Sequence, residues 1–200
     1  AKSRADQSAQ VSEAGEGNDV KDKAKSFLAT YLKDLEGLET AAALAQWKAA
    51  NTGSEEDFAD AAEASLAVRT FHSDPEAYQR VKELTGQAEE LTRSEARTIQ
   101  LAELAYRSNQ LPPDLLQKMV ELSTEIERSF GTFRATIDDR QASNNDLLEI
   151  LAEENDSARR RMAWEALKQV GGAVAPKLIQ LAKLRNQAAH ELGFNDYWEM

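Results

Sequence analysis

The sequence predicts an all-α fold, a multi-helix array that begins with a long helix. Residues of high helix propensity, chiefly Ala, Leu, Glu, Lys, Gln and Arg, dominate the 200-residue chain. Only 9 glycines and 4 prolines interrupt it. Apolar residues recur at the spacing of one helix face, and Ser, Thr or Asp precedes most of these stretches, as expected for helix N-caps.

The first two helices are predicted on either side of a break at residues 51–53, Asn-Thr-Gly. The first is expected to start at an Asp19 N-cap and to continue through Trp47. The second is expected to begin after Ser54, because the three acidic residues that follow suit the positive end of a helix dipole. It should run towards His72.

Later helices carry their own start signals. Asp74-Pro75 joins a capping carboxylate to a proline at the first helical position, and Thr92 with Glu95 matches a capping box. The remaining helices are expected over residues 114–130, 144–151, 157–170 and 176–192, the last ending at Gly193. Residues 131–142 are expected to form one short extended hairpin.

Charge and composition exclude several classes of partner. The net charge is −11, from 35 acidic and 24 basic residues, and this field disfavours nucleic acid and anionic lipid. The absence of Cys excludes disulfides and thiolate zinc sites. No apolar run approaches the roughly 20 residues that a membrane span needs. Oligomeric state is left open.

Residues 1–18 are small and polar and predict a flexible leader ahead of a helical segment over residues 19–200. The leader is interpreted as a tether left by a cleaved export signal, which favours a periplasmic or secreted protein. A frayed terminus of a cytoplasmic protein is the alternative. At the other end, Tyr197 and Trp198 follow a helix start signal at Asn195, so we expect the segment to be part of a longer protein.

The chain offers no catalytic or metal-binding set. A zinc hydrolase helix needs two His at i and i+4, and this chain has only 2 His in all. His72 suits a helix end, where a local hydrogen bond explains it. His190-Glu191 resembles the opening of the zinc motif, but Phe194 stands where the second His is required. We interpret His190 as a surface residue near a helix C-terminus.

The other polar clusters have structural explanations. Adjacent acids point about 100° apart on a helix and are interpreted as solvated faces; the pairs are Glu89-Glu90, Asp138-Asp139 and Glu153-Glu154. The run of arginines at 159–161 is interpreted as an ion-pair cluster. Trp47, Trp164 and Trp198 are interpreted as core residues.

Three stretches stand out in order along the chain: residues 27–31 with 45–53, residues 162–171, and residues 184–198. Together they resemble the N-terminal half of the angiotensin-converting-enzyme family of peptidyl-dipeptidases. They are also similar to the related thimet and oligoendopeptidase group. Residues 130–132 stand where that family has a short extended excursion.

The resemblance implies a zinc metallopeptidase acting on short peptides, with its zinc ligands beyond Met200. This segment would form a lid and one wall of the cleft, and alone it is expected to be inactive. Lys168 stands at the position where the family has a chloride-binding Arg, so the resemblance makes Lys168 a candidate anion site. The alternative is an ordinary surface lysine. A non-enzymatic helical interaction module is the alternative function.

Overall fold

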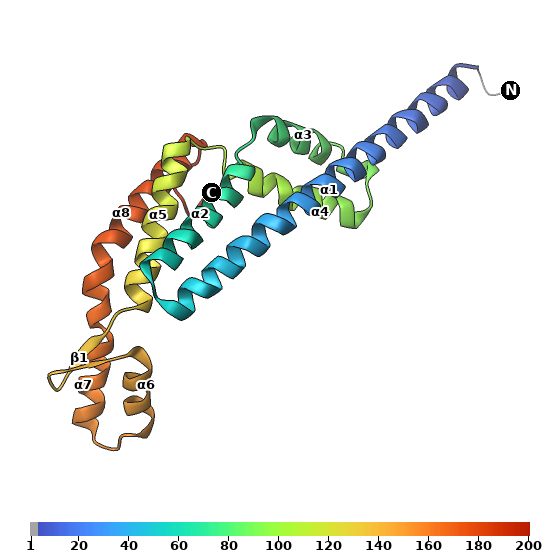
Figure 1. Ribbon diagram of the computed structural model, residues 1–200. Helices are drawn as coiled ribbons and strands as arrows, with labels where there is room; N and C mark the ends of the chain where they lie inside the picture. Colours follow the sequence, from blue (N-terminus) through green and yellow to red (C-terminus); the bar gives the residue numbers. More distant parts are fainter. Residues whose placement is uncertain (1–3) are drawn as a thin grey trace. The chain divides into compact units, whose positions relative to one another are not determined.

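The computed structural model describes the backbone of residues 4–200 and the side chains of residues 19–200. It is helical apart from one small hairpin, which confirms the predicted all-α class (Figure 1). The predicted leader over residues 1–18 lies outside the side chains described and stays a prediction. No helix of the described part is both long and apolar enough to cross a membrane.

The helices occupy two compact units, and α1 and α2 contribute to both. Unit 1 holds residues 1–42 and 66–113, and unit 2 holds residues 43–65 and 114–200. The helices are α1 (Arg4–Thr52), α2 (Glu55–Phe71), α3 (Pro75–Thr85), α4 (Arg93–Arg107), α5 (Pro113–Gly131), α6 (Asn144–Glu153), α7 (Ser157–Leu167) and α8 (Gln169–Glu191). A 3-10 turn, η1 (Ala88–Glu90), joins α3 to α4.

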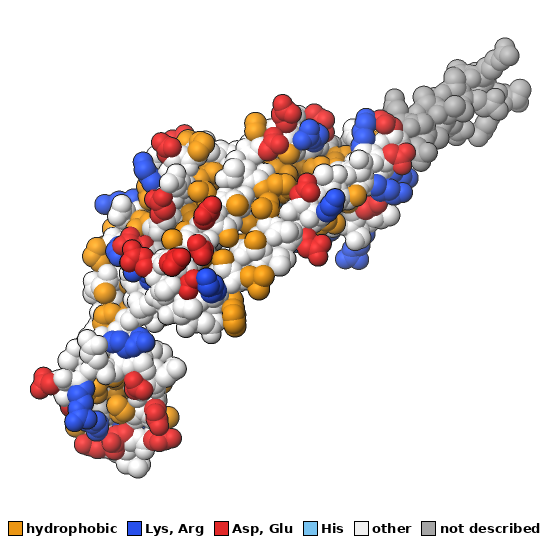
Figure 2. All heavy atoms as spheres, viewed as in Figure 1, with side chains coloured by type: hydrophobic (Ala, Val, Ile, Leu, Met, Phe, Trp, Pro, Cys, Tyr) orange, Lys and Arg blue, Asp and Glu red, His pale blue; other side chains and the backbone are white. Residues whose placement is uncertain are grey.

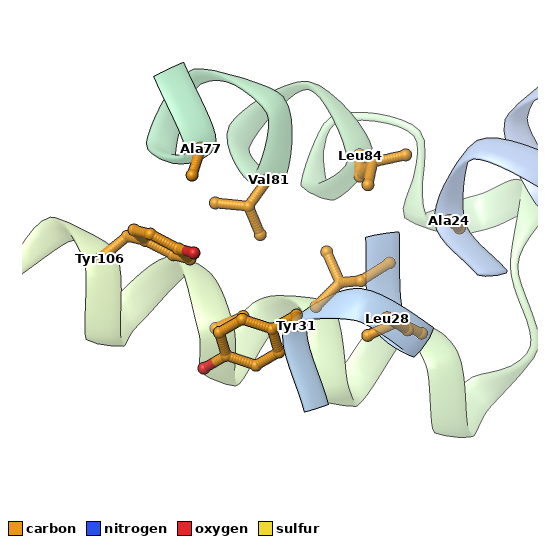
Figure 3. Close-up of a cluster of buried hydrophobic side chains, with 9 residues drawn as sticks. Ala24, Leu28, Tyr31, Ala77, Val81, Leu84 and Tyr106 are labelled. Atoms are coloured by element: carbon orange, nitrogen blue, oxygen red, sulfur yellow. The ribbon is translucent and has the colours of Figure 1, made fainter. Parts of the chain in front are cut away.

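Unit 1 is built on the pair α3 and α4, with α1 packed against it. Three residues of α1, Ala24, Leu28 and Tyr31, recur at i, i+4 and i+7 and are buried against both helices (Figure 3). Val81 of α3 and Ile99 of α4 are fully buried in the same cluster. Apolar residues on one face of each helix therefore account for this core.

Predicted caps fix the starts of α3 and α4. Asp74 Oδ1 accepts hydrogen bonds from the backbone N–H groups of Glu76 and Ala77 at 2.8 and 3.1 Å. Thr92 and Glu95 form the reciprocal capping box. Because each cap satisfies N–H groups that the first helical turn leaves unpaired, these boundaries are readable from a few residues.

Unit 2 contains the predicted hairpin. β1 (Ala135–Ile137) pairs antiparallel with β2 (Arg140–Ala142), and the two-residue turn between them, Asp138-Asp139, has positive φ angles of 51° and 60°. Gln169 extends the pairing, because its side chain both accepts from Thr136 N and donates to Thr136 O, each at 2.9 Å. The hairpin packs on α6 and α7 through small and aliphatic side chains.

Three predicted helix boundaries are wrong: α7 ends at Leu167 rather than at residue 170, and the starts of α1 and α8 also differ. α1 is already helical at Asp19, whose carboxylate therefore pairs with Lys23 at 2.5 Å instead of capping the helix. α8 begins at Gln169 and contains Pro176, which we expected at its first position. Proline in a helix displaces the carbonyl four residues earlier, and here that residue is Gly172, whose backbone adapts easily.

The end of α8 follows the prediction. Gly193 has a φ of +84°, and Phe194 N donates to Ala189 O at 2.9 Å while Gly193 N donates to His190 O at 3.0 Å. This is the glycine-terminated helix end that the sequence predicts. The chain then turns at Asn195, whose backbone N–H donates to Glu199 at 2.7 Å.

The three tryptophans are exposed, so the prediction that they lie in the core is wrong. Trp47 is 68% exposed, Trp164 54% and Trp198 97%. In α1, Ala45 and Ala49 face Phe58 of α2, which places Trp47 on the opposite side of the helix. Figure 2 shows hydrophobic side chains reaching the surface among charged ones.

Candidate functional site

The candidate site is a groove in unit 1 between α1, α3 and α4. Its volume is about 830 Å³, within the roughly 300–1,000 Å³ usual for small-ligand sites. Four aromatic residues line its apolar part: Phe27, Tyr31, Phe71 and Tyr106. Their rings form one cluster, with centroid separations from 5.5 to 6.1 Å between neighbouring rings. Figure 2 shows hydrophobic side chains at the surface between α1 and α3.

Helix spacing explains why these rings meet. Phe27 and Tyr31 are one turn apart on α1 and stack at 5.5 Å. Phe71 is the last residue of α2, and Tyr106 lies in the last turn of α4. Aromatic pairs at these separations stabilise a fold by about 0.5–1.5 kcal/mol beyond their buried area.

His72 packs against three rings of this cluster, with centroid separations of 5.1 to 5.9 Å. It is 4% exposed, its Nδ1 lies 3.0 Å from Val68 O, and its Nε2 lies 3.1 Å from the Tyr31 hydroxyl. Because a carbonyl can only accept, Nδ1 carries the proton and Nε2 accepts from Tyr31. Burial lowers the pKa of His72, so the ring is neutral.

The expected local hydrogen bond of His72 is therefore confirmed, but a charge interaction with the helix dipole is not its role. A neutral ring gains nothing from the negative end of α2. What the sequence did not indicate is the long-range partner, Tyr31, which lies 41 positions away. Both ring nitrogens are occupied, so His72 has no free atom for a metal.

The Tyr106 hydroxyl opens into the groove. Tyr106 is 2% exposed and lines the groove, yet its hydroxyl has no hydrogen-bond partner among the described residues. Every fully buried side-chain nitrogen or oxygen in that part of the chain has a partner, so this oxygen reaches accessible space. In Figure 3 it points towards the space beside α3, while the Tyr31 hydroxyl points away from α3.

Burial also keeps that hydroxyl protonated. It raises the pKa of Tyr106 to about 12; Tyr31, Asp74 and Asp34 act in the same direction, and Arg80 opposes them. The group is a hydrogen-bond donor throughout the physiological range. Neither Tyr106 nor the groove was predicted from the sequence, since the signal is three-dimensional: a polar atom without a partner in an apolar recess.

The rim of the groove carries a small excess of negative charge. Asp34, Asp74 and Glu83 line it against Lys23 and Arg80. Lys23 is already paired with a carboxylate one turn earlier on α1, at 2.5 Å. The rim is therefore better suited to a cation than to an anion.

Lys168 lies apart from the groove, in unit 2. It is exposed, links α7 to α8, and holds its Nζ 5.2 Å from the centroid of the Trp164 ring. A surface lysine explains this arrangement, and the anion assignment stays a prediction.

The remaining predicted polar residues lie on the surface. His190 is exposed in the last turn of α8, and its Nε2 bonds to Asn195 O at 2.8 Å. The expected arginine ion pairs are confirmed: Arg159 pairs with Asp138 at 2.5 Å, and Arg161 with Glu165 at 2.8 Å. The described residues contain no group of three His, Asp or Glu side chains placed to hold a metal, so zinc does not fit them.

Caps and ion pairs account for most of the polar clusters that the sequence singled out in this all-α chain. The family model described as angiotensin-converting enzyme matches residues 18–200. The chain therefore belongs to the angiotensin-converting-enzyme family, a family of peptidases. A comparison with curated proteins gives no match. Similarity to the thimet and oligoendopeptidase group stays a prediction.

Proposed function

We propose that this chain is the N-terminal, cleft-covering portion of a zinc metallopeptidase that hydrolyses short peptides. The family match over residues 18–200 carries the proposal. In such an enzyme the zinc polarises the scissile carbonyl and activates a water molecule. The zinc ligands are proposed to lie on polypeptide outside residues 1–200.

The role assigned to this chain is to limit which peptides reach the cleft. Unit 1 is suited to form part of a wall, because one apolar core holds α1 to α3 and α4. The two histidines support the proposal that the zinc ligands lie outside this chain, because each histidine already uses a ring nitrogen in a hydrogen bond to another residue. The proposal includes a location outside the cytoplasm, suggested by the polar residues 1–18, and chloride near Lys168.

Reconstitution from two pieces tests the proposal. The chain and the remainder of its peptidase are produced separately, and each is assayed with zinc on a short fluorogenic peptide and on a long unfolded one. We expect each piece alone to cleave the peptides more slowly than the mixture does. We expect the mixture to cleave the short peptide faster than the long one. A remainder that is fully active alone, with unchanged size preference, contradicts the gating role.

The alternative is a non-enzymatic interaction module. The exposed Trp47, Trp164 and Trp198 favour it, since large exposed apolar residues are typical of binding surfaces. The same experiment separates the two functions. A module gains no peptidase activity when mixed with any further part of its own protein.

A further inference from the structure

We propose that the groove between α1, α3 and α4 binds the amino-terminal end of a short peptide. The apolar side chain of that peptide lies on the aromatic cluster, one of its carbonyl oxygens accepts a hydrogen bond from Tyr106, and its ammonium group lies near Asp34. The choice of a peptide as ligand rests on the proposed function. The geometry of the groove is independent of it.

The Tyr106 hydroxyl is a donor that no other described residue uses. Tyr106 is 2% exposed and lines the groove, and its hydroxyl oxygen is not fully buried, so it can donate to a group in the groove. A ligand carbonyl there would take the place of water as the acceptor.

The rim of the groove carries more negative than positive charge. Three carboxylates face two cations there, and Lys23 is occupied by Asp19. Asp74 uses one carboxylate oxygen to cap α3. Asp34 is exposed and has no hydrogen bond or ion pair among the described residues, so its carboxylate is the best placed to receive an ammonium group.

The size and shape of the groove also suit a short peptide. A volume of about 830 Å³ accommodates a ligand of the size of a tripeptide. Phe27 is half-buried at the edge of the cluster, so an apolar side chain can stack on it without displacing a core residue. Ala77 and Leu84 of α3 complete the apolar wall.

Titration calorimetry of the whole chain with the tripeptide Phe-Ala-Ala tests the proposal. We expect saturable binding at one site per chain. Acetylation of the peptide's amino group removes the charge and should weaken binding about fivefold or more, because the ammonium group would lose its charged hydrogen bond to Asp34. Replacement of the phenylalanine by alanine should weaken it by a similar factor.

Two variants locate the site. Tyr106→Phe removes only the hydroxyl and should weaken binding about threefold to tenfold, the loss expected for one neutral hydrogen bond. Asp34→Asn should remove most of the difference between the free and the acetylated peptide. Tyr78→Phe on α3 and Glu36→Gln on α1 are the controls, since neither residue lines the groove and both substitutions should leave binding unchanged. Circular dichroism verifies that each variant folds.

Several outcomes overturn the proposal: no saturable binding, equal binding of the acetylated peptide, or equal binding by Tyr106→Phe. Concentration-dependent self-association that Tyr106→Phe abolishes also overturns it, because a second copy of the chain would then occupy the groove. The measurement involves neither zinc nor cleavage. Binding without reconstituted activity therefore contradicts only the proposed function, and activity without binding contradicts only this inference.

Discussion

The hydroxyl of Tyr31 donates a hydrogen bond to Nε2 of His72 across 3.1 Å, which ties α1 to the end of α2 in unit 1. The bond requires a neutral imidazole, because a protonated Nε2 cannot accept. The ring packs edge-on against Phe71 and Tyr106, with centroids 5.1 Å away in both cases. The stability of unit 1 is thereby linked to pH.

Acid should destabilise unit 1 through His72. Burial lowers the pKa of His72 in the folded chain, so the unfolded chain binds the proton first as pH falls. The contribution of this residue is complete above its ordinary pKa of about 6.5 and is lost as pH decreases below that value. Urea unfolding at pH 7.5 and 5.5 measures the loss.

His72→Gln should reduce that loss, and His190→Gln, on the exposed end of α8, should leave it intact. Both substitutions remove one imidazole ring, which is buried at position 72 and exposed at position 190. If His72→Gln lost as much stability between the two pH values as the unaltered chain, the link between His72 and pH would be wrong.

Asp57 should stabilise the junction of α1 and α2, and this stabilisation should be lost in acid. Its buried carboxylate accepts from Lys48 Nζ and from the Thr52 hydroxyl, both at 2.5 Å. Hydrogen bonds from Lys48 and Thr52 lower the pKa of Asp57 to about 2. The depressed pKa means that the stabilisation is present above about 4, the ordinary value, and disappears as pH falls towards 2.

Thermal unfolding of Asp57→Asn tests this. The variant should melt several degrees below the unaltered chain at pH 7, and the gap should narrow at pH 2.5. Asp60→Asn is the control, because that exposed carboxylate lies 3.9 Å from Lys48 and contributes little. A gap that stays constant with pH would contradict the role of the ionised carboxylate.

Two glycines should respond in opposite ways to alanine. Gly53 ends α1 with a φ of +68°, and an added Cβ would lie 3.2 Å from Thr132 Cγ2. Gly53→Ala should therefore cost about 1–2 kcal/mol. Gly37 is exposed inside α1 with nothing near its added Cβ, so Gly37→Ala should stabilise by about 0.5–1 kcal/mol. Urea unfolding gives both values; equal signs would contradict the backbone assignment.

The core of unit 1 should depend on Ile99. This residue is fully buried in the cluster formed by α1, α3 and α4. Ile99→Ala should lower the free energy of unfolding by about 2–5 kcal/mol through lost contacts and the cavity left behind. Leu104→Ala, on the exposed side of the same helix, should cost under about 1 kcal/mol. Denaturant unfolding of the two variants should rank them in this order.

Helix boundaries set by local chemistry could be read from the sequence. Asp74, Thr92 and Gly193 act within four residues of themselves, and the structure confirms all three. Pro176 was misassigned because tolerance of a proline inside α8 depends on the backbone one turn earlier, where Gly172 stands. In the sequence alone, a proline that starts a helix cannot be told from a proline that a helix tolerates in its interior.

Burial and the candidate site could not be read in the same way. Trp47 lies on an apolar stretch of α1, but Ala45 and Ala49 take the buried face. The groove depends on where Tyr106 of α4 meets Tyr31 of α1, residues 5.9 Å apart at their ring centroids but distant in the chain. Periodicity predicts that a face is apolar, but not which surface meets it.

We propose that this chain is part of a peptidase whose metal centre lies on other polypeptide. The most direct measurement is the zinc content of the purified chain after dialysis against zinc, by elemental analysis, with cleavage of a short fluorogenic peptide followed in the same sample. We predict zinc well below one ion per chain and no cleavage above the rate without protein. One tightly bound zinc per chain, together with cleavage that a chelator abolishes, would contradict the account.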